Sequence, residues 1–372
     1  MTPFRWTPEH LAAIGRAPAS SAPVIAPGDA ARVSPGVDLW DHWPVLEEDG
    51  RLAEVAGGLL VVALSAPVLP DPDARHAMAR LRLLHRSDRG RGVVWRDRGP
   101  LLPDGFSPGS REWAGSAVLD AAHRRLTLYF TAAGRRGEPA VTFDQRLFET
   151  SAAVAVEGGA VRLADWMSPA EIVRPDGVIY ETDMTGGGAV GTIKAFRDPY
   201  FIRAGTDELL LFAASRAGAA SGHNGLVGAA VRRGGSWALL PPLVDAVGVN
   251  NELERPHAIE HDGRVYLFWS TQTKVFAPGF AAPTGLYGLV ADEWGAPWRP
   301  LNGHGLVFAN PDTAPAQAYS WQVLPDLTVW SFADMVGLAR APRSPAEARA
   351  HFAGAPAPVL RLLLDGTSAR LA

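Results

Sequence analysis

The chain has 372 residues, of which 47% are hydrophobic, so it is long enough to bury a large core. Its formal net charge is −4, no block of basic residues offers a surface for nucleic-acid phosphates, and no apolar run approaches the roughly 20 residues of a membrane span. The absence of cysteine excludes disulfides, thiolate nucleophiles and cysteine-ligated zinc. We therefore expect neither nucleic acid nor a membrane as a partner.

The N-terminal segment MTPFRWTPEHL lacks the basic and apolar regions of a standard secretory signal. The expected location is the cytoplasm, or outside the cell by a route that needs no signal peptide. Thr7-Pro8 is typical of the start of a short helix, and Ser344-Pro345-Ala346-Glu347 predicts another. We expect one catalytic domain over residues 1–372, with residues 1–35 as an extension that packs on it.

One pattern recurs five times: a turn or polar cluster, followed by a β-branched or aromatic run that ends in small or hydroxyl residues. The spacing from one unit to the next is about 60 to 80 residues, and further apolar runs follow each strand. Five such units predict an all-β fold, a five-bladed β-propeller with a central, funnel-shaped active site. The five strands are expected at residues 57–66, 123–132, 207–215, 262–271 and 325–334.

A short cluster rich in aromatic or charged residues lies upstream of each predicted strand. Because equivalent positions of the innermost strands converge at one mouth of a propeller, we expect the carboxylates of Asp41, Asp198 and Glu254 to meet there. Each cluster alone also fits a simpler interpretation, as a turn residue, a side chain bonded to its own backbone or a solvated ion pair. Recurrence at matching places favours a shared site. The clusters are LWDHWP, REWAGS, FRDP, ELERPH and AYSW.

The third cluster interrupts an apolar strand with Arg197-Asp198-Pro199. Proline cannot donate to a sheet ladder, so this segment is predicted to lie at a strand start, an edge or a bulge. Chains commonly present functional side chains at such places.

Two other motifs are weaker. His257-Ala-Ile-Glu-His261 matches a zinc pattern that needs a helix, but it lies between a proline and a turn, where an extended strand separates the imidazoles by about 13 Å. Gly186-Gly187-Gly188-Ala-Val-Gly191 matches a dinucleotide-binding pattern, but no strand precedes it and no helix follows. We interpret the first as a strand and the second as a loop, and expect no metal and no cofactor.

Two carboxyl groups that flank a glycosidic bond can hydrolyse or transfer it, one as nucleophile and one as acid and then base. A third, ionised carboxylate can bind sugar hydroxyls and stabilise an oxocarbenium-like transition state. Aromatic side chains such as Trp40 and Trp113 suit the walls of a sugar pocket.

These segments resemble glycoside hydrolase family 68, the levansucrases, inulosucrases and related β-fructofuranosidases, and the shorter Gram-negative members most. The resemblance covers nearly the whole chain and rests on WTPEHL, LWDHWP, REWAGS, FRDP, LLPPLVDAVGVNNELERPH, LYGLV, PLNGHGLVFANP and AYSWQVLP. It implies a five-bladed propeller that transfers fructosyl groups from sucrose, with sucrose and fructo-oligosaccharide acceptors as small-molecule partners. We expect a monomer.

The resemblance also implies residue roles: Asp41 as nucleophile, Asp198 as transition-state stabiliser and Glu254 as acid/base. Arg197 is expected to keep Asp198 ionised, and the like charges near Glu254 are expected to raise its pKa so that it holds a proton. The residues that match positions lining the substrate pocket are Trp40, Trp113, Arg197, Glu252, Arg255, Gln272 and Tyr319.

The chain departs from the family pattern on the acceptor side. Gln272 stands where relatives carry histidine or arginine, Ala213 replaces a glutamate, Trp321 replaces a histidine, and the loop between residues 217 and 227 is short. These differences favour hydrolysis and short fructo-oligosaccharides over long levan, unless Trp321 or His223 provides another acceptor platform.

The calcium site of Gram-positive members also looks incomplete, with Asn251 where an aspartate is expected. Two alternatives to this function remain open. One is a furanosidase of the family 32 or 43 type, which acts on other fructosides or arabinosides. The other is a sugar-binding propeller without catalysis.

Overall fold

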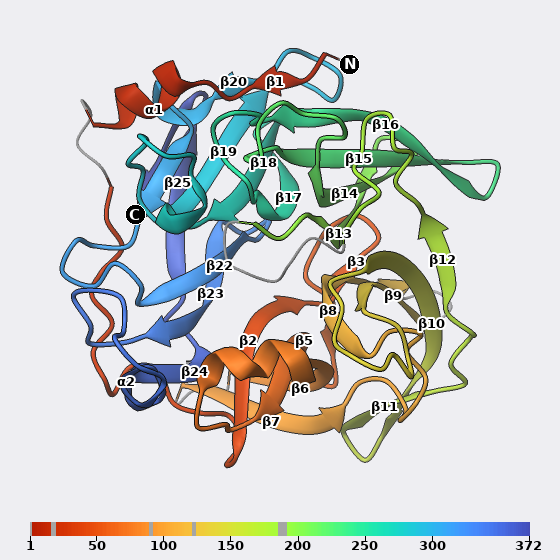
Figure 1. The fold of residues 1–372 in the computed structure, drawn as a ribbon. Helices are drawn as coiled ribbons and strands as arrows, with labels where there is room; N and C mark the ends of the chain where they lie inside the picture. Colours follow the sequence, from red (N-terminus) through yellow and green to blue (C-terminus); the bar gives the residue numbers. More distant parts are fainter. Residues whose placement is uncertain (1, 16–19, 89–91, 121–123, 185–191) are drawn as a thin grey trace.

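The computed structural model describes residues 2–15, 20–88, 92–120, 124–184 and 192–372. These residues form five β-sheets arranged as blades around a central axis (Figure 1), so the predicted all-β, five-bladed propeller is confirmed. Each cluster picked out in the sequence contributes to the innermost strand of a blade, and each predicted strand is the second strand of the same blade.

The first two blades come from the first half of the chain. Blade 1 consists of β2 (Val37–Pro44), β5 (Gly58–Pro67), β6 (Arg80–Asp88) and β7 (Val93–Pro100), with β4 (Glu54–Val55) beside β5. Blade 2 consists of β8 (Arg111–Asp120), β9 (Arg125–Ala133), β10 (Gln145–Glu157) and β11 (Ala160–Ala164), with β3 (Leu46–Glu47) beside β8 and β12 (Ala170–Val173) beside β10.

The other three blades follow in chain order. Blade 3 consists of β13 (Phe196–Ala204), β14 (Asp207–Ser215), β15 (Gly225–Arg233) and β16 (Ser236–Asp245). Blade 4 consists of β17 (Glu254–His261), β18 (Arg264–Thr271), β19 (Gly285–Ala291) and β20 (Arg299–Pro300), with β21 (Leu306–Ala309) beside β19. Blade 5 consists of β22 (Ala318–Val323), β23 (Thr328–Met335), β24 (Phe352–Pro356), β25 (Leu360–Asp365) and β26 (Ser368–Leu371).

The second strands are apolar along almost their whole length because neighbouring blades cover both of their faces. In β5 and β18 all but the terminal residues are buried. A strand buried on both faces appears in the sequence as a continuous apolar run, whereas a half-exposed strand alternates. The five runs were therefore visible in the sequence.

Helices are short and peripheral. The two predicted ones are confirmed as α1 (Pro8–Ile14) and α2 (Pro345–His351), and the 3₁₀ helices are η1 (Pro72–Met78), η2 (Thr273–Val275) and η3 (Leu301–Gly303). Strand β1 (Phe4–Arg5) pairs in parallel with β16, so the N-terminal segment lies against blade 3. In the part of the chain that the structure describes, no helix is long and apolar enough to cross a membrane.

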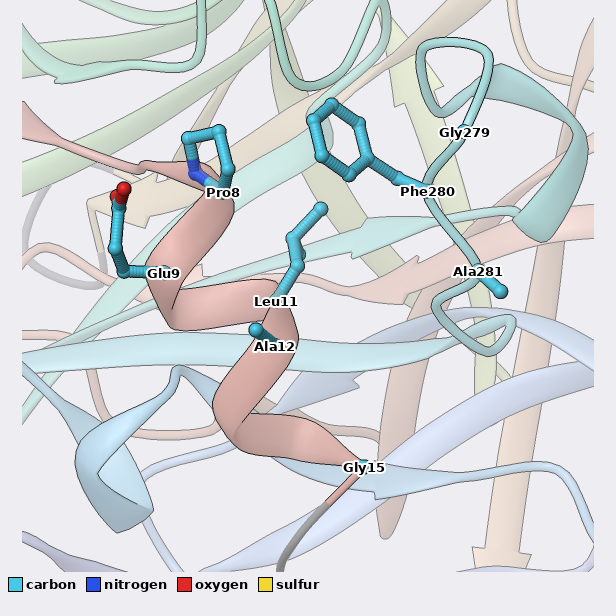
Figure 2. Close-up of a pocket in the computed structure, with 8 residues that line it drawn as sticks. All are labelled: Pro8, Glu9, Leu11, Ala12, Gly15, Gly279, Phe280 and Ala281. Atoms are coloured by element: carbon cyan, nitrogen blue, oxygen red, sulfur yellow. The ribbon is translucent and has the colours of Figure 1, made fainter.

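A surface groove of about 530 Å³ lies between α1 and the loop that contains Phe280 (Figure 2). Leu11 and Phe280 face each other across it. None of the residues proposed from the sequence for the active site lines this groove.

Every innermost strand carries a β-bulge of one extra residue at the equivalent place. The segment Arg197-Asp198-Pro199 lies in one of them, which confirms the prediction from its proline. Four bulged residues have a positive φ, a conformation that costs a residue with a side chain about 1–3 kcal/mol and that clusters at functional sites. They are Asp41 (26°), Asp198 (62°), Arg255 (49°) and Ser320 (61°).

Blade 1 is joined to blade 5 through a buried carboxylate. Asp38 of β2, whose side chain is 1% exposed, forms ion pairs with Arg32 (2.9 Å) and with Arg349 of α2. Both arginines also donate to the carbonyl oxygen of Phe352, at 3.2 and 2.9 Å. This cluster therefore closes the ring of blades between its first and last members.

Asp38→Ala is expected to lower the free energy of unfolding by about 3–5 kcal/mol, because it leaves two arginines without their buried partner. The control is Asp49→Ala, which breaks an exposed pair with Arg51 and should cost about 1 kcal/mol or less. Chemical denaturation of both variants measures the difference. Equal stability of the two variants would show that the cluster does not hold the ring closed.

Candidate active site

The five bulges place ten side chains at one end of the central axis. Each blade provides a residue just before its bulge and the bulged residue itself, and we refer to these ten residues as the bulge ring. The residues before the bulges are Trp40, Trp113, Arg197, Glu254 and Tyr319, and the bulged residues are Asp41, Ala114, Asp198, Arg255 and Ser320. The sequence-predicted acids therefore come together from three blades, with two arginines among them.

Arg197 organises the acids of blades 3 and 4. Its Nη2 donates to Glu252 Oε2 at 2.7 Å and to Glu254 Oε1 at 2.8 Å, and its Nε lies 3.8 Å from Asp198 Oδ2. All but Glu254 are buried, and the Glu254 side chain is 21% exposed. A single guanidinium thus fixes the orientation of three carboxylates while one of them stays open to solvent.

Arg255 connects three blades beneath the acids. Its guanidinium donates from Nη1 to Ser320 Oγ (2.8 Å) and from Nη2 to the His42 carbonyl (3.2 Å) and Gln322 Oε1 (3.1 Å). Its backbone N–H donates to Asp198 Oδ2 at 3.1 Å.

Asp198 is less acidic than the sequence suggested. Burial raises its pKa to about 6, and the Glu254 and Asp41 carboxylates add to this, although Arg197 and the Arg255 N–H lower it. Arg197 therefore favours the ionised form of Asp198, as expected, but burial has the larger effect and the net shift of the pKa is upward. Above pH 6 the carboxylate is still mostly ionised.

Asp41 is a half-buried carboxylate whose pKa is influenced by the charge of Arg255. Burial raises its pKa and Glu254 adds to this, while Arg255, a hydrogen bond with Ser320 and the charge of Arg75 lower it. The result is a pKa above the ordinary value. Arg255 and Ser320 therefore favour the ionised form of Asp41.

The pKa values of the neighbouring Glu252 and Glu254 carboxyl groups are shifted in opposite directions. Burial and the neighbouring Glu254 raise the pKa of Glu252 to about 7. Burial also raises the pKa of Glu254, but Arg197 and hydrogen bonds with Glu252 and Tyr319 lower it further, so its net shift is downward. The prediction of a raised pKa for Glu254 is therefore wrong, because the sequence did not reveal how its partners are arranged.

The buried donors of the described site residues that lack a hydrogen-bond partner include the Nη1 atom of Arg197 and the indole N–H of Trp113. Unpaired buried donors cost free energy and are normally satisfied by protein, water or ligand. Donors next to carboxylates and aromatic rings suit a ligand with several hydroxyl groups, as a sugar has.

Comparison with known proteins decides the family. Residues 1–224 and 213–372 match the profile of the Levansucrase/Invertase family, glycoside hydrolase family 68. The chain belongs to family 68. A levansucrase of Pseudomonas savastanoi pv. glycinea is 32% identical to it over 391 residues, which cover 94% of this chain and 89% of that protein.

The structural comparison agrees. An inulosucrase from Halalkalicoccus jeotgali, bound to kestose, shares 38% identity with this family 68 chain at a TM-score of 0.91, covering 100% of this chain and 95% of that one. A levansucrase from Gluconacetobacter diazotrophicus, 22% identical with a TM-score of 0.83, has the same fold. Membership of family 68 decides against the two alternative interpretations, a furanosidase of the family 32 or 43 type and a non-catalytic sugar-binding propeller.

The acceptor-side residue Gln272 lies at the same end of the axis as the bulge ring. It is half-buried just before η2, two residues beyond Ser270, which pairs with Glu254. Ala213, which stands where many family 68 members carry glutamate, is buried and pairs with Arg197. Ala213 therefore lies opposite Arg197, and Gln272 lies two residues beyond the cross-strand partner of Glu254.

Trp321 does not replace the missing acceptor contacts. Its side chain is 0% exposed and packs edge-on against Phe308, with ring centroids 5.6 Å apart. The interpretation of Trp321 as an acceptor platform is therefore wrong. The tryptophan lies in the bulge of β22, where its side chain turns into the core.

Sequence reasoning missed the part played by η1. Its Arg75 lies over the Trp40 ring at 5.4 Å, and its His76 lies edge-on to the same ring at 5.9 Å. His76 itself is exposed to solvent. The charged cluster DPDARHAMAR directly after a predicted strand was the available signal.

The rejected zinc motif is a strand, as predicted. His257 donates from Nδ1 to the Arg255 carbonyl at 2.9 Å and accepts at Nε2 from the Val323 N–H at 2.8 Å, so both nitrogens are used. The described residues include no group of three or more His, Asp or Glu that could hold a metal ion. The glycine-rich segment 186–191 lies outside the described residues.

Proposed function

We propose that this chain transfers the fructosyl group of sucrose through a covalent fructosyl-enzyme, with Asp41, Asp198 and Glu254 as its three catalytic residues. The observation that supports this most is the convergence of these carboxylates with Arg197 and Arg255 in the bulge ring. Binding alone does not require a nucleophile beside a proton donor.

In the first step the Asp41 carboxylate attacks the anomeric carbon of the fructosyl unit, and the bond to the glycosidic oxygen breaks. Glu254 donates a proton to that oxygen, so that glucose leaves as a neutral alcohol. The raised pKa of Glu252 favours its protonated form, and Glu252 is hydrogen-bonded to Glu254. A proton therefore passes from Glu252 to Glu254 before the step, so that Glu254 can act as the acid. Asp198 accepts hydrogen bonds from fructosyl hydroxyls.

In the second step Glu254, now ionised, removes a proton from water or from a sugar hydroxyl. The oxygen attacks the same carbon, the bond to Asp41 breaks, and the configuration is retained. Retaining chemistry requires the Asp41 and Glu254 carboxyl groups to lie about 5–5.5 Å apart with substrate bound. A separation near 9 Å would indicate inversion.

The deciding experiment is incubation with sucrose, followed by assay of free glucose and mass spectrometry of the acid-quenched enzyme. We expect glucose release and one fructosyl group on the peptide that contains Asp41. Glucose release without an adduct on that peptide, under conditions where the second step is slow, would contradict the covalent route. No glucose release would contradict the proposed substrate.

The absence of a cationic or imidazole donor at Gln272, and of a carboxylate at Ala213, leaves few groups to position an incoming sugar. A positioned acceptor gains several kcal/mol of effective concentration over a loosely held one. We therefore propose that water competes well and that the products are mainly fructose and short fructo-oligosaccharides.

Gln272→His is expected to raise the ratio of transfer to hydrolysis about three- to tenfold, the effect of one added hydrogen bond of about 1 kcal/mol. Chromatography of products at high sucrose concentration measures the ratio. Gln272→Ala is the matched control and should lower it or leave it unchanged. Abundant high-mass fructan from the unmodified enzyme would refute the lean toward hydrolysis.

A further inference from the structure

Lysine is used at only two positions, Lys194 and Lys274, among 35 basic residues. Lys194 is half-buried just before β13, three residues from Arg197 of the active site. The compact ammonium group of Lys194 therefore lies on the segment that leads into the bulge ring.

The Lys194 ammonium is surrounded by oxygen atoms from two other segments. It donates to the Gly222 carbonyl at 2.6 Å and to Asn224 Oδ1 at 2.7 Å, and Asn251 Oδ1 lies at 3.4 Å. We refer to these three oxygens as the cradle. One lysine thus ties the loop before β15 and the segment before β17 to the start of β13.

Each side of the cradle is fixed independently. Asn224 Nδ2 donates to the Arg216 carbonyl at 2.7 Å, and Asn251 Nδ2 donates to the Ile193 carbonyl at 3.0 Å. The Lys194 carbonyl accepts from Gln145 Nε2 at 2.7 Å. The oxygens of both asparagines are therefore turned toward the ammonium because their nitrogens are held elsewhere.

The geometry explains why lysine stands here rather than arginine or a metal ion. An ammonium has three donors on one small centre, whereas a guanidinium is a wide planar fork that would not fit between three converging oxygens. A divalent cation prefers carboxylate ligands, and the cradle has only amide and peptide oxygens with a positive charge already present. Asn251, the departure from the calcium site of Gram-positive relatives, fits this arrangement.

We propose that Lys194 acts as a built-in cation that holds the segment bearing Glu252 in place, and so serves as a positioning residue for the acid pair. The connection is short: Asn251 Nδ2 also lies 3.4 Å from Glu252 Oε1, and Glu252 Oε2 accepts from Arg197, which binds Glu254. This inference rests on the proposed function only where the test measures sucrose cleavage.

The charges around Lys194 agree with this role. Burial lowers its pKa, while the carboxylates of Glu181 and Glu252 raise it, and the charge of Lys194 lowers the pKa of the neighbouring His223. Removing the ammonium would leave the three cradle oxygens facing one another without a donor between them. The segment from Asn250 to Glu252 should then move and change how the acid pair shares its proton.

The test uses Lys194→Ala, which leaves room for the lost atoms, and Lys194→Met, which fills the room without charge. We expect both to lower kcat for sucrose cleavage about 10- to 100-fold, the range for loss of charged hydrogen bonds, with KM changed less than about threefold. Both should also shift the basic limb of the pH profile. Arg174→Met, which removes an exposed positive charge, is the control and should retain wild-type kinetics.

Chemical rescue separates positioning from general destabilisation. n-Propylammonium, which reproduces the missing side-chain atoms and charge, should restore most of the activity of Lys194→Ala in a saturable way, and none to Lys194→Met. It should also raise the melting temperature of Lys194→Ala above that in sodium chloride at equal ionic strength, a readout that needs no turnover. A chelator should leave the melting temperature of the wild type unchanged.

Wild-type kcat and pH profile in Lys194→Met would overturn the proposal, as would a Lys194→Ala enzyme that is folded, impaired and not rescued. If Lys194→Ala and Lys194→Met both fail to fold, Lys194→Arg is the test, because it keeps the charge but not the shape of the ammonium. A lowered kcat with a shifted pH profile would support the cradle, and wild-type kinetics would overturn it. If the wild type cleaves no sucrose, the proposed function fails, while the melting measurements still test the cradle.

Discussion

Asp41→Asn should abolish glucose release from sucrose, with kcat lowered about 10⁴-fold or more, because no covalent fructosyl-enzyme can form. Asparagine keeps the size of the side chain and tolerates the positive φ of this position, whereas alanine would add backbone strain. Any loss of activity in Asp41→Asn therefore reports chemistry. Glucose assay over a long incubation measures it, and activity near that of the wild type would remove Asp41 from its role.

The same variant should not lose stability. Burial raises the pKa of Asp41 in the folded protein, so the folded state binds the proton more tightly than the unfolded state, and stability is lost as pH rises through this range. Asp41→Asn has no charge to bury and should melt at or above the wild-type temperature near pH 7, with the difference vanishing at low pH. A lower melting temperature at pH 7 would mean that the pairing with Arg255 outweighs burial.

Glu254→Gln should slow sucrose cleavage about 10²- to 10⁴-fold, the usual contribution of a positioned acid. In the wild type, kcat/KM should fall as pH rises through about 7, because the pair of Glu252 and Glu254 then loses its one proton. Glu254→Gln should remove this basic limb. A fructoside whose leaving group needs no proton should recover much of the rate of the first step.

Glu252→Gln is the matched control. It keeps Glu254 as the donor but removes the neighbouring carboxyl group that raises the pair's apparent pKa. With Arg197 still bound to Glu254, the basic limb should move to lower pH while measurable activity remains near pH 5. An unchanged limb in both variants would show that another group provides the proton.

The fold was predictable because blades are covered on both faces, which makes each second strand a continuous apolar run. The acids were found because their clusters recur at one place in the repeat, and Pro199 indicated the bulge at Asp198. Positive φ angles at Arg255 and Ser320 were not predictable, because neither residue favours that conformation and only contacts between blades impose it.

The directions of the pKa shifts of Glu252 and Glu254 were also not predictable from the sequence. Sequence shows that Glu252 and Glu254 are two residues apart, but not that one guanidinium binds both and that Tyr319 lowers the pKa of Glu254. Because coupled carboxylates divide their protons by such contacts, the pKa directions needed the folded structure. The inward turn of Trp321 was hidden for the same reason, since a bulge changes which way a side chain points.

The hydrogen bonds of Arg255 depend on the first and the last blade together. Its guanidinium takes partners from β2 near the start and from β22 near the end, at His42, Ser320 and Gln322. A growing polypeptide that has completed four blades still lacks Ser320 and Gln322, and with them the support for Arg255 and Asp41. The side-chain support for Arg255 is therefore complete only when the last blade has docked against the first.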